Sequence, residues 1–326
     1  MMLRKRRLFL TALGALGLSV LIPGCGRTAP PLRIATNPWV GYEFMFLARH
    51  EGWISPQDTV LVEAGSATGA LDLLASGKAD GAALTLDEML RAREQGLPLM
   101  AVLVFDISVG ADVLLAKPGI ETLAQLKGKR IGFEQSAVGA LMLHKALEAA
   151  GLQMADVKTV PVTFDRHLQV WHAGEVDALI TFEPNSTHLL AEDARRLFDS
   201  SRIPDTIFDV LAVTSAVAER HHEALHQLVA AHFRGLTAFH KNPYDTAYRM
   251  AERFKLSPKE VIGAFRGLEM PNASRNRKFL HDENSVIVNA AKELGMIMAQ
   301  AGIIKNSQID LSNLIGADFI PREETR

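Results

Sequence analysis

The sequence contains a single cysteine, Cys25, in 326 residues. One thiol excludes an internal disulfide, a CxxC redox pair, a cysteine-ligated iron–sulfur cluster and a cysteine-rich zinc site. Charge of one sign is not in excess, because 35 Lys and Arg stand against 37 Asp and Glu, so nothing indicates nucleic-acid binding. The Walker A, GxGxxG and GxSxG patterns are absent too, which leaves no standard motif for nucleotide binding or serine catalysis.

Long apolar runs are also scarce, since the mean hydropathy is only +0.09 and one such run stands out, near the N-terminus. This excludes a polytopic membrane protein. Basic residues at 4–7 precede the apolar stretch 8–21, and Ile22-Pro23-Gly24-Cys25 follows, which is the layout of a secretory signal and is similar to a bacterial lipobox. We therefore expect a lipoprotein signal peptide at 1–24, lipidation of Cys25, and a tether at 25–31 that holds the exported body at a membrane. An uncleaved anchor helix is the alternative, and the residues 5–10 leave Sec or twin-arginine export open.

After residue 31, strands and helices alternate, and the pattern occurs twice. Arg33 and Arg130 lie 97 residues apart, and Asp80 and Asp177 keep the same offset. Each half reads strand, helix, strand, helix, a Gly-x-x-Asp turn and a further strand. Such alternation predicts mostly parallel sheets covered by helices, in two similar lobes.

The last third of the chain predicts helices at 216–239, 245–254, 258–268 and 283–302. They have no sheet of their own, so we expect them to pack on a lobe. Residues 208–213 read as a strand, and if it returns to the first lobe, two crossovers near 108–113 and 209–213 join the lobes. The expected division is 32–109 with 211–326 as lobe one and 110–210 as lobe two, closing on a ligand.

Four motifs occur in order: R-I-A-x-N-P-W-x-G-Y from Arg33, A-S-G-K-A-D-G-A from Ala75, L-K-G-K-R-I-G from Leu126 and G-E-V-D-A-x-x-x-x-E-P from Gly174. Together they resemble the solute-binding proteins of ABC importers, in the nitrate/taurine/sulfonate and thiamine-precursor (NMT1/THI5-like) family. The resemblance covers about residues 32–240. It implies an α/β fold of the type II periplasmic binding protein kind, with two lobes, two hinge crossovers and a helical C-terminal extension on lobe one. It does not identify the ligand.

Ligands of open α/β sheets bind beyond the carboxyl ends of the strands, which selects the loops that follow them. These loops supply hydroxyl, amide, aromatic and carboxylate side chains as candidate ligand contacts. The candidates are Asn37, Trp39, Tyr42, Ser66, Thr68, Thr85, Asp87, Asp106, Ser108, Asp112, Glu134, Ser136, Asp165 and Glu183. Simpler roles stay open, because Trp39 can pack under lobe one, Ser66 and Thr68 can cap a helix, and Glu183 can merely end a strand.

The sign of charge in these loops narrows the ligand. Eight acidic residues lie in or beside them, whereas the nearby cations are Arg91, Arg166 and His167. Nitrate or a sulfonate needs cationic side chains or several N–H donors, and a buried carboxylate without a partner is unfavourable. We therefore expect a ligand that is cationic or rich in N–H donors, such as a heteroaromatic amine. The thiamine-precursor branch fits this better than nitrate.

One segment matches a metalloprotease motif, because His222-Glu223-Ala224-Leu225-His226 has the form HExxH and His232 follows. A third ligand at that distance needs a glycine turn, but Val229 holds the position, within a segment that reads as continuing helix. His232 would then lie about 15 Å along the axis from His222. We expect no catalytic metal and no cofactor; adventitious metal binding by His222 and His226 is the alternative.

These observations favour a non-enzymatic, lipid-anchored solute-binding protein in the periplasm or cell envelope. It would capture a small polar molecule and deliver it to an ABC permease. The alternative is a sensor that signals ligand binding to a membrane-bound partner, and neighbouring genes would separate the two. A secreted enzyme is a third interpretation. We expect a monomer with no nucleic-acid partner.

Overall fold

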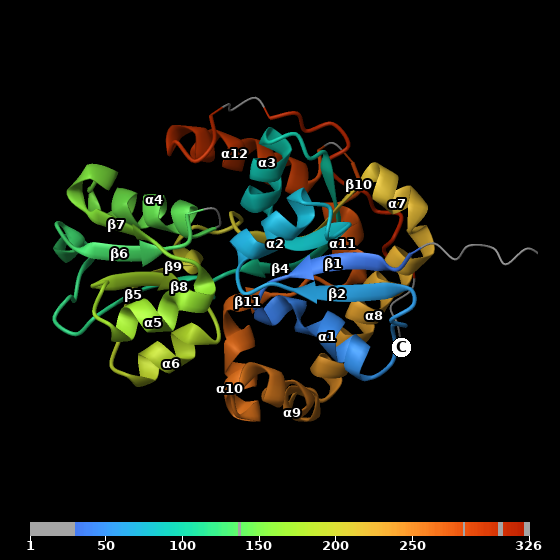
Figure 1. The fold of residues 1–326 in the computed structure, drawn as a ribbon, viewed down its shortest axis with the longest axis horizontal. Helices are drawn as coiled ribbons and strands as arrows, with labels where there is room; N and C mark the ends of the chain where they lie inside the picture. Colours follow the sequence, from blue (N-terminus) through green and yellow to red (C-terminus); the bar gives the residue numbers. More distant parts are fainter. Residues whose placement is uncertain (1–29, 136–137, 283, 306–308, 323–326) are drawn as a thin grey trace, which may run out of the picture. The chain divides into compact units, whose positions relative to one another are not determined.

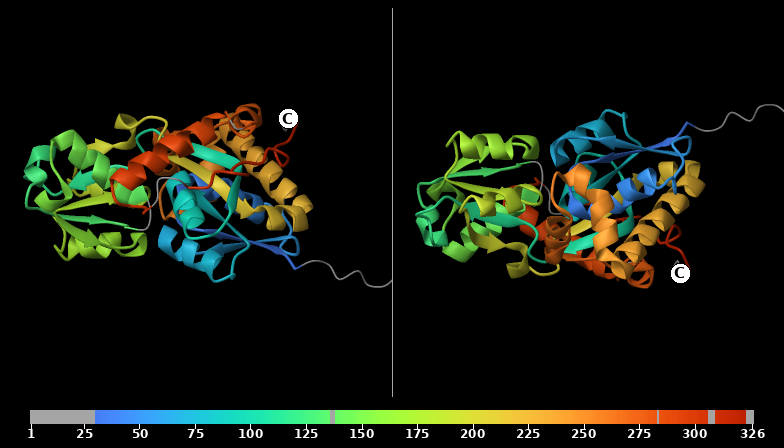
Figure 2. Two further views of the ribbon diagram at one scale, coloured as in Figure 1. Left: turned by 90° about the horizontal axis from the view of Figure 1, so that it is seen from above. Right: turned by 90° about the horizontal axis from the view of Figure 1, so that it is seen from below.

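The computed structural model describes residues 30–135, 138–282, 284–305 and 309–322. The predicted signal peptide, Cys25 and Ser136 lie outside these ranges. Among the described residues, no helix has the length and apolar character needed to cross a bilayer. Residues from Pro31 onward form two lobes, which lie side by side in the views from above and below (Figure 2).

Lobe one is built on a six-stranded sheet in the order β11-β4-β10-β3-β1-β2. Its strands are β1 (Leu32–Thr36), β2 (Thr59–Glu63), β3 (Gly81–Thr85), β4 (Leu99–Ser108), β10 (Phe208–Thr214) and β11 (Leu268–Glu269). Its helices are α1 (Glu43–His50), α2 (Ala67–Ala75), α3 (Leu86–Glu94), α7 (Ser215–Arg220), α8 (His222–Lys241), α9 (Pro243–Phe254), α10 (Pro258–Ala264), α11 (Ala273–Phe279) and α12 (Val286–Gln300).

Lobe two is built on a five-stranded sheet in the order β7-β6-β8-β5-β9. Its strands are β5 (Val113–Ala116), β6 (Arg130–Phe133), β7 (Lys158–Pro161), β8 (Ala178–Thr181) and β9 (Arg195–Asp199). Its helices are α4 (Val138–Ala150), α5 (His167–His172) and α6 (Asn185–Ala191). Figure 1 shows α4 on one face of this sheet and α5 and α6 on the other.

The 97-residue repeat in sequence is a repeat in structure. In lobe one, the β1–β3 pairing sets Ile34 against Gly81, and in lobe two the β6–β8 pairing sets Ile131 against Ala178, at the same offset. In each lobe an ion pair joins the start of the first strand of this pair to the turn that precedes the second strand. Arg33 Nη2 lies 2.7 Å from Asp80 Oδ1, and Arg130 Nη2 lies 2.7 Å from Asp177 Oδ1.

In both lobes the same aspartate also accepts the backbone N–H of its arginine, at 2.9 Å and 2.8 Å. Each carboxylate therefore fixes where two neighbouring parallel strands begin. The loops that follow those strands consequently leave the sheet at one common edge.

The predicted fold class is confirmed, but the expectation of mostly parallel sheets is wrong. Only β2-β1-β3 and β7-β6-β8 pair in parallel, whereas β10, β4, β11, β5 and β9 join by antiparallel pairs. The reason is the route of the chain, which leaves lobe one after β4 and re-enters it in β10, between β3 and β4. Two crossovers join the lobes, at 109–112 and 200–207.

The C-terminal helices pack on lobe one, with α8 against α1 and α12 against α3. The predicted helix 216–239 divides at His221, and the predicted helix 258–268 is wrong at its end, where β11 pairs with β4. Helix α11 had no counterpart among the expected helices. α8 runs unbroken through Val229, as expected. His232 is buried against the rings of Phe44 and Phe105, and burial lowers its pKa to about 3, so it is a neutral core residue.

The paired arginine–aspartate contacts give a first test. The bonds from Arg130 hold the pKa of Asp177 at about 2, below its ordinary 3.8. Its stabilising contribution is therefore complete above pH 4 and lost as the pH falls through 2. We expect Asp80→Asn and Asp177→Asn each to lower the melting temperature at pH 7 by about 2–4 °C, as followed by circular dichroism.

The matched control is Asp72→Asn, which changes an exposed aspartate on α2 and is expected to leave the melting temperature unchanged. Equal melting temperatures for all three variants and the unmodified protein at pH 7 would show that the two ion pairs do not stabilise the strand ends.

Candidate functional site

A pocket lies where the two lobes face each other. The arrows of β1 and β6 point toward one another, so the carboxyl ends of the parallel strands meet across it (Figure 1). The lining residues are Asn37, Trp39, Tyr42, Ala67, Thr85, Glu88, Asp112, Glu134, Val138, Gly139, His167, Ile180, Phe182 and Asp209. The cavity volume is about 20 Å³, which is room for one or two waters.

Aromatic rings from both lobes form the wall of the pocket. Trp39 of lobe one meets Phe182 of lobe two edge to face, with ring centroids 5.3 Å apart. Phe182 in turn stacks on Phe164 at 4.3 Å, with the planes nearly parallel. This wall favours a flat, partly apolar ligand, since aromatic side chains pack on such groups without needing polar partners.

The segment after β1 holds two of the aromatic residues against carboxylates. Trp39 Nε1 donates to Asp106 Oδ2 at 3.1 Å, and the Tyr42 hydroxyl donates to Asp209 Oδ1 at 2.5 Å. Gly41 permits the close approach, because a Cβ at that position would lie 1.8 Å from Asp106 Oδ2. The residues between Asn37 and Tyr42 are thus shaped to place a tryptophan and a tyrosine over two acidic side chains.

Four carboxylates of the site are almost wholly buried: Glu88, Asp106, Asp112 and Asp209 are each at most 2% exposed. Burial raises the pKa of Asp112 to about 7 and that of Asp106 to about 8. Burial also raises the pKa values of Glu88 and Asp209 well above the usual range, with repulsion from Asp106 adding to the effect on Asp209. Asp106 and Asp209 are direct cross-strand partners in β4 and β10.

No positive side chain compensates this cluster within the pocket, because none of the described lining residues is Lys or Arg. His167 had been counted among the nearby cations, and that expectation is wrong. Its Nε2 lies 3.2 Å from the Val162 carbonyl and its Nδ1 3.1 Å from Thr181 Oγ1. Burial lowers its pKa to about 4, so His167 is neutral at physiological pH.

The pocket also has a surplus of hydrogen-bond acceptors. Three buried oxygens that belong to lining residues lack a partner among the described residues: Asn37 Oδ1, Asp112 Oδ2 and Asp209 Oδ2. Buried polar atoms are normally paired. A proton shared by Asp106 and Asp209, which hydrogen-bond to each other, can satisfy Asp209, whereas the oxygens of Asn37 and Asp112 can accept from a bound N–H or O–H group.

The structure brings six of the sequence-predicted residues to the pocket wall, namely Asn37, Trp39, Tyr42, Thr85, Asp112 and Glu134. Asp106 lies behind the wall as the partner of Trp39. Asp87 is buried in the first turn of α3, where burial raises its pKa to about 6. Thr68 contacts Glu134, and its backbone N–H donates to Oε1 at 2.8 Å.

Four other predicted residues do not line the pocket. Ser66 caps α2 by accepting the N–H of Gly69. Ser108 lies at a crossover, with its Oγ 2.7 Å from that of Ser200. Asp165 is exposed, and half-buried Glu183 accepts the N–H of Thr187 within lobe two. Ser136 lies outside the described residues.

Sequence reasoning missed Glu88, Phe182 and Asp209 as site residues. Asp209 stands at the start of antiparallel β10, so the rule that selects loops after strands passed over it, although its amino end reaches the same edge. The sequence signal that could have identified Asp209 is a carboxylate near the start of an otherwise apolar strand. Glu88 completes a capping box with Thr85, whose N–H it accepts at 2.9 Å, and that helix-start role hid its place in the pocket.

The buried acids predict an unusual dependence of stability on pH. Carboxyl groups whose pKa is raised on folding bind more protons in the folded state, so their contribution to stability is lost as the pH rises through the folded pKa. With pKa values raised from 3.8 to about 7 for Asp112 and about 8 for Asp106, we expect the melting temperature of the ligand-free protein to fall between about pH 4 and pH 8.

Asp106→Asn is expected to flatten this decline, because the amide oxygen still accepts from Trp39 while the titrating proton is gone. Asp165→Asn, at an exposed position, is the control and keeps the original slope. Thermal unfolding followed by circular dichroism at several pH values measures the slopes. A melting temperature that stays level or rises across this range would contradict the protonated cluster.

The family comparison matches the description "NMT1/THI5 like" to residues 42–246. A Haemophilus influenzae protein named "Putative thiamine biosynthesis protein" is 30% identical over 131 residues, which are 39% of this chain and 41% of that protein. The matched part therefore spans about two fifths of that curated relative's length.

Solved structures share the fold over most of their length. The alkanesulfonate-binding protein SsuA from Xanthomonas axonopodis pv. citri, bound to MOPS, has a TM-score of 0.74 at 18% identity, covering 89% of this chain and 99% of that one. The periplasmic nitrate-binding protein NrtA from Synechocystis PCC 6803 has a TM-score of 0.69 at 11% identity, covering 91% and 92%. The desulfurization enzyme DSZB has a TM-score of 0.61 at 16% identity, covering 89% and 97%.

At these identities the structural likeness establishes the fold, which is that of the periplasmic solute-binding proteins of ABC importers. The family match extends over more than half of the sequence and includes both lobes. The chain belongs to the NMT1/THI5-like family.

Proposed function

We propose that this protein captures a cationic or N–H-rich small molecule, such as a heteroaromatic amine, and delivers it to an ABC permease. The observation that carries the proposal is the set of buried carboxylates in a pocket whose described lining contains no Lys or Arg. A bound amine supplies the missing donors and the missing positive charge at once. A sulfonate or nitrate would instead need positive side chains, and the described lining contains no Lys or Arg.

The shape of the site supports a flat ligand. The ring of Trp39 of lobe one and that of Phe182 of lobe two meet edge to face, so a planar ring that enters between separated lobes would find an aromatic side chain on each side. Its N–H groups can reach the unpaired oxygens of Asp112 and Asp209 at the pocket edge. Aromatic contacts then contribute affinity, and the carboxylates select for amines.

Closure of the lobes is the proposed binding mechanism. The expected division is 32–109 with 211–326 as lobe one and 110–210 as lobe two, but residues 208–210 begin β10 of lobe one. We therefore take the crossovers at 109–112 and 200–207 as the hinge, in place of the expected second crossover near 209–213. The small free volume of the pocket requires opening for entry and release. Binding energy is gained in the closed state, where both lobes touch the ligand, and the permease would recognise the closed surface.

We further propose that the protein acts outside the cytoplasm as a monomeric lipoprotein, attached through Cys25 and a short tether, and that it is not an enzyme. The basic, apolar and lipobox-like order of residues 4–25 supports this location. An attached binding protein stays close to its permease, which raises its effective concentration there.

The first test is a thermal-shift panel on the purified protein. It compares 4-aminopyrimidine, cytosine, thiamine, putrescine and spermidine with taurine, ethanesulfonate and nitrate. A specific ligand at one hundred times its Kd is expected to raise the melting temperature by about 2 °C or more for a protein of this size. Shifts with amines alone support the proposal, and a shift with sulfonate or nitrate alone contradicts the charge argument.

A second test uses the amine with the largest shift in calorimetric titrations. For thiamine, putrescine or spermidine, which stay cationic between pH 6 and pH 8, affinity is expected to rise over this range because the acids must lose protons to pair with a cation. For 4-aminopyrimidine or cytosine, which are neutral there, no such rise is expected. Asp112→Asn is expected to weaken binding about tenfold or more, the effect of losing a charge-assisted hydrogen bond. Asp165→Asn, outside the pocket, is the matched control, and equal losses for the two variants would contradict a specific role for Asp112.

A further inference from the structure

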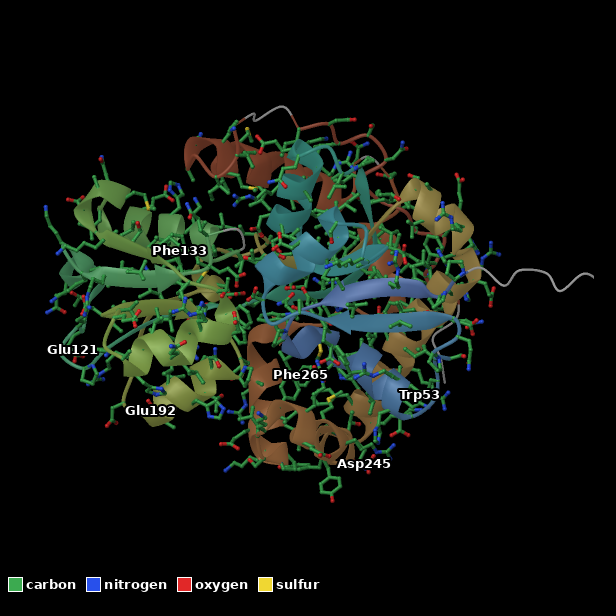
Figure 3. All side chains as sticks on the ribbon, viewed as in Figure 1. Trp53, Glu121, Phe133, Glu192, Asp245 and Phe265 are labelled. Carbon is green, nitrogen blue, oxygen red and sulfur yellow. The ribbon has the colours of Figure 1, made fainter. Side chains whose placement is uncertain are left out.

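Glu134 differs from the other carboxylates of the pocket because its partners belong to both lobes. It follows directly after β6 of lobe two, whose last residue, Phe133, is labelled in Figure 3, and it is only 4% exposed. Its Oε1 accepts the backbone N–H of Thr68 at 2.8 Å and the Thr68 hydroxyl at 2.5 Å. Its Oε2 accepts the N–H of Phe164 at 3.2 Å, within lobe two.

The lobe-one partner of this carboxylate is the beginning of α2. Ser66 is the N-cap residue and accepts the N–H of Gly69 at 3.1 Å, which leaves the N–H of Thr68 pointing out of the first turn. First-turn N–H groups have no acceptor inside the helix, and the helix end carries a partial positive charge. Such ends bind anions. Here a carboxylate from the chain's other lobe stands in the anion's place.

A second contact between the lobes lies next to it. Arg91 Nη1 of α3 donates to the carbonyl oxygen of Gln135 at 2.9 Å. Lobe one therefore holds the described residues after β6 through two neighbouring helices. Of these two contacts between the lobes, the one made by Glu134 is part-buried and the one made by Arg91 is exposed.

We propose that the contact between Glu134 and the start of α2 holds the two lobes closed, and we call this contact the latch. In this contact the carboxylate of Glu134 occupies the place at the helix end that an anionic group of a ligand could otherwise fill. The proposal rests on closure as the binding mechanism and deepens it. The chain itself supplies the anion for the helix end, so the ligand need not carry one. Glu134 is thus a positioning residue, which acts on affinity through the fraction of closed protein.

The test compares Glu134→Ala with the unmodified full chain by hydrogen–deuterium exchange, without any ligand. Removal of the carboxylate is expected to speed amide exchange in peptides that contain Thr68 and Phe164 by about tenfold or more. Opening is also expected to increase acrylamide quenching of tryptophan fluorescence, because Trp39 lies at the lobe contact and is 4% exposed. A purely local role for Glu134 would leave the quenching unchanged.

Chemical rescue separates the latch from general damage. Formate at 100 mM is expected to slow exchange at Thr68 and reduce quenching in Glu134→Ala, because a small carboxylate can fill the vacated place at α2, and to leave the unmodified protein unaffected. Glu183→Ala is the matched control, since its carboxylate also accepts a backbone N–H but only within lobe two. It is expected to change exchange near Thr187 alone.

Unchanged exchange at Thr68 together with unchanged quenching in Glu134→Ala would overturn the latch, as would quenching that rises equally in Glu183→Ala. Since these readouts need no ligand, they are independent of the amine panel. If no amine binds but formate rescues the variant, the latch is supported and the proposed ligand class is wrong. If an amine binds but Glu134→Ala changes neither exchange nor quenching, the ligand class is supported and the latch is wrong.

Discussion

The cost of removing carboxylates from water is the constraint on which this site depends. Asp106 and Asp209 face each other across two buried strands, and one oxygen of each accepts a hydrogen bond from an aromatic side chain. Burial raises the pKa of both groups, and repulsion from Asp106 adds to the effect on Asp209, whereas the hydrogen bond between the two acids lowers the pKa of Asp106. A structure that only needed stability would replace them by apolar residues of the same size. Their presence beside a cavity fits the proposed ligand, whose N–H groups and positive charge would compensate the buried acids.

A cluster of buried acids must be held in place by a rigid scaffold, and the repeated arginine–aspartate contacts contribute to the rigidity of both sheets. Asp80 and Asp177 each bind both the guanidinium and the backbone N–H of an arginine that begins the neighbouring strand. This fixes where the parallel strands begin, and thereby the register with which their carboxyl ends reach the pocket at the opposite edge of each sheet. The lobes therefore carry preformed halves of the site, and closure has only to bring the halves together.

The sequence was sufficient for the fold and for part of the site, for physical reasons that differ between residues. The offset between Arg33 and Arg130 predicted two similar lobes because a repeated local pattern folds in the same way twice. Trp39, Tyr42 and Asp112 could be selected because they follow strands. Asp209 could not, since its place at the edge depends on the antiparallel return of β10, a long-range pairing that local patterns do not encode.

The neutral state of His167 was equally beyond the sequence, because it depends on burial and on a carbonyl acceptor from another segment. The strand β11 shows the same limit. Its two residues belong to a segment that reads as helix, and they become a strand only because the edge of β4 is available to pair with them. Local propensity is a weak prior wherever tertiary contacts compete with it.

The position of the acids relative to the helices bears on the proposal that this chain takes an amine in a fold whose solved neighbours include sulfonate- and nitrate-binding proteins. Loops that open helices direct partly positive N–H groups toward the cleft, so the bare scaffold favours anions, in keeping with the names of its sulfonate- and nitrate-binding neighbours. In this chain Asp87 and Glu88 occupy the first turn of α3, and Glu134 reaches the first turn of α2. The partial positive charge of both helix ends reduces the cost of burying these carboxyl groups. The preference for a cationic ligand that we propose would therefore use the dipoles of the scaffold rather than oppose them.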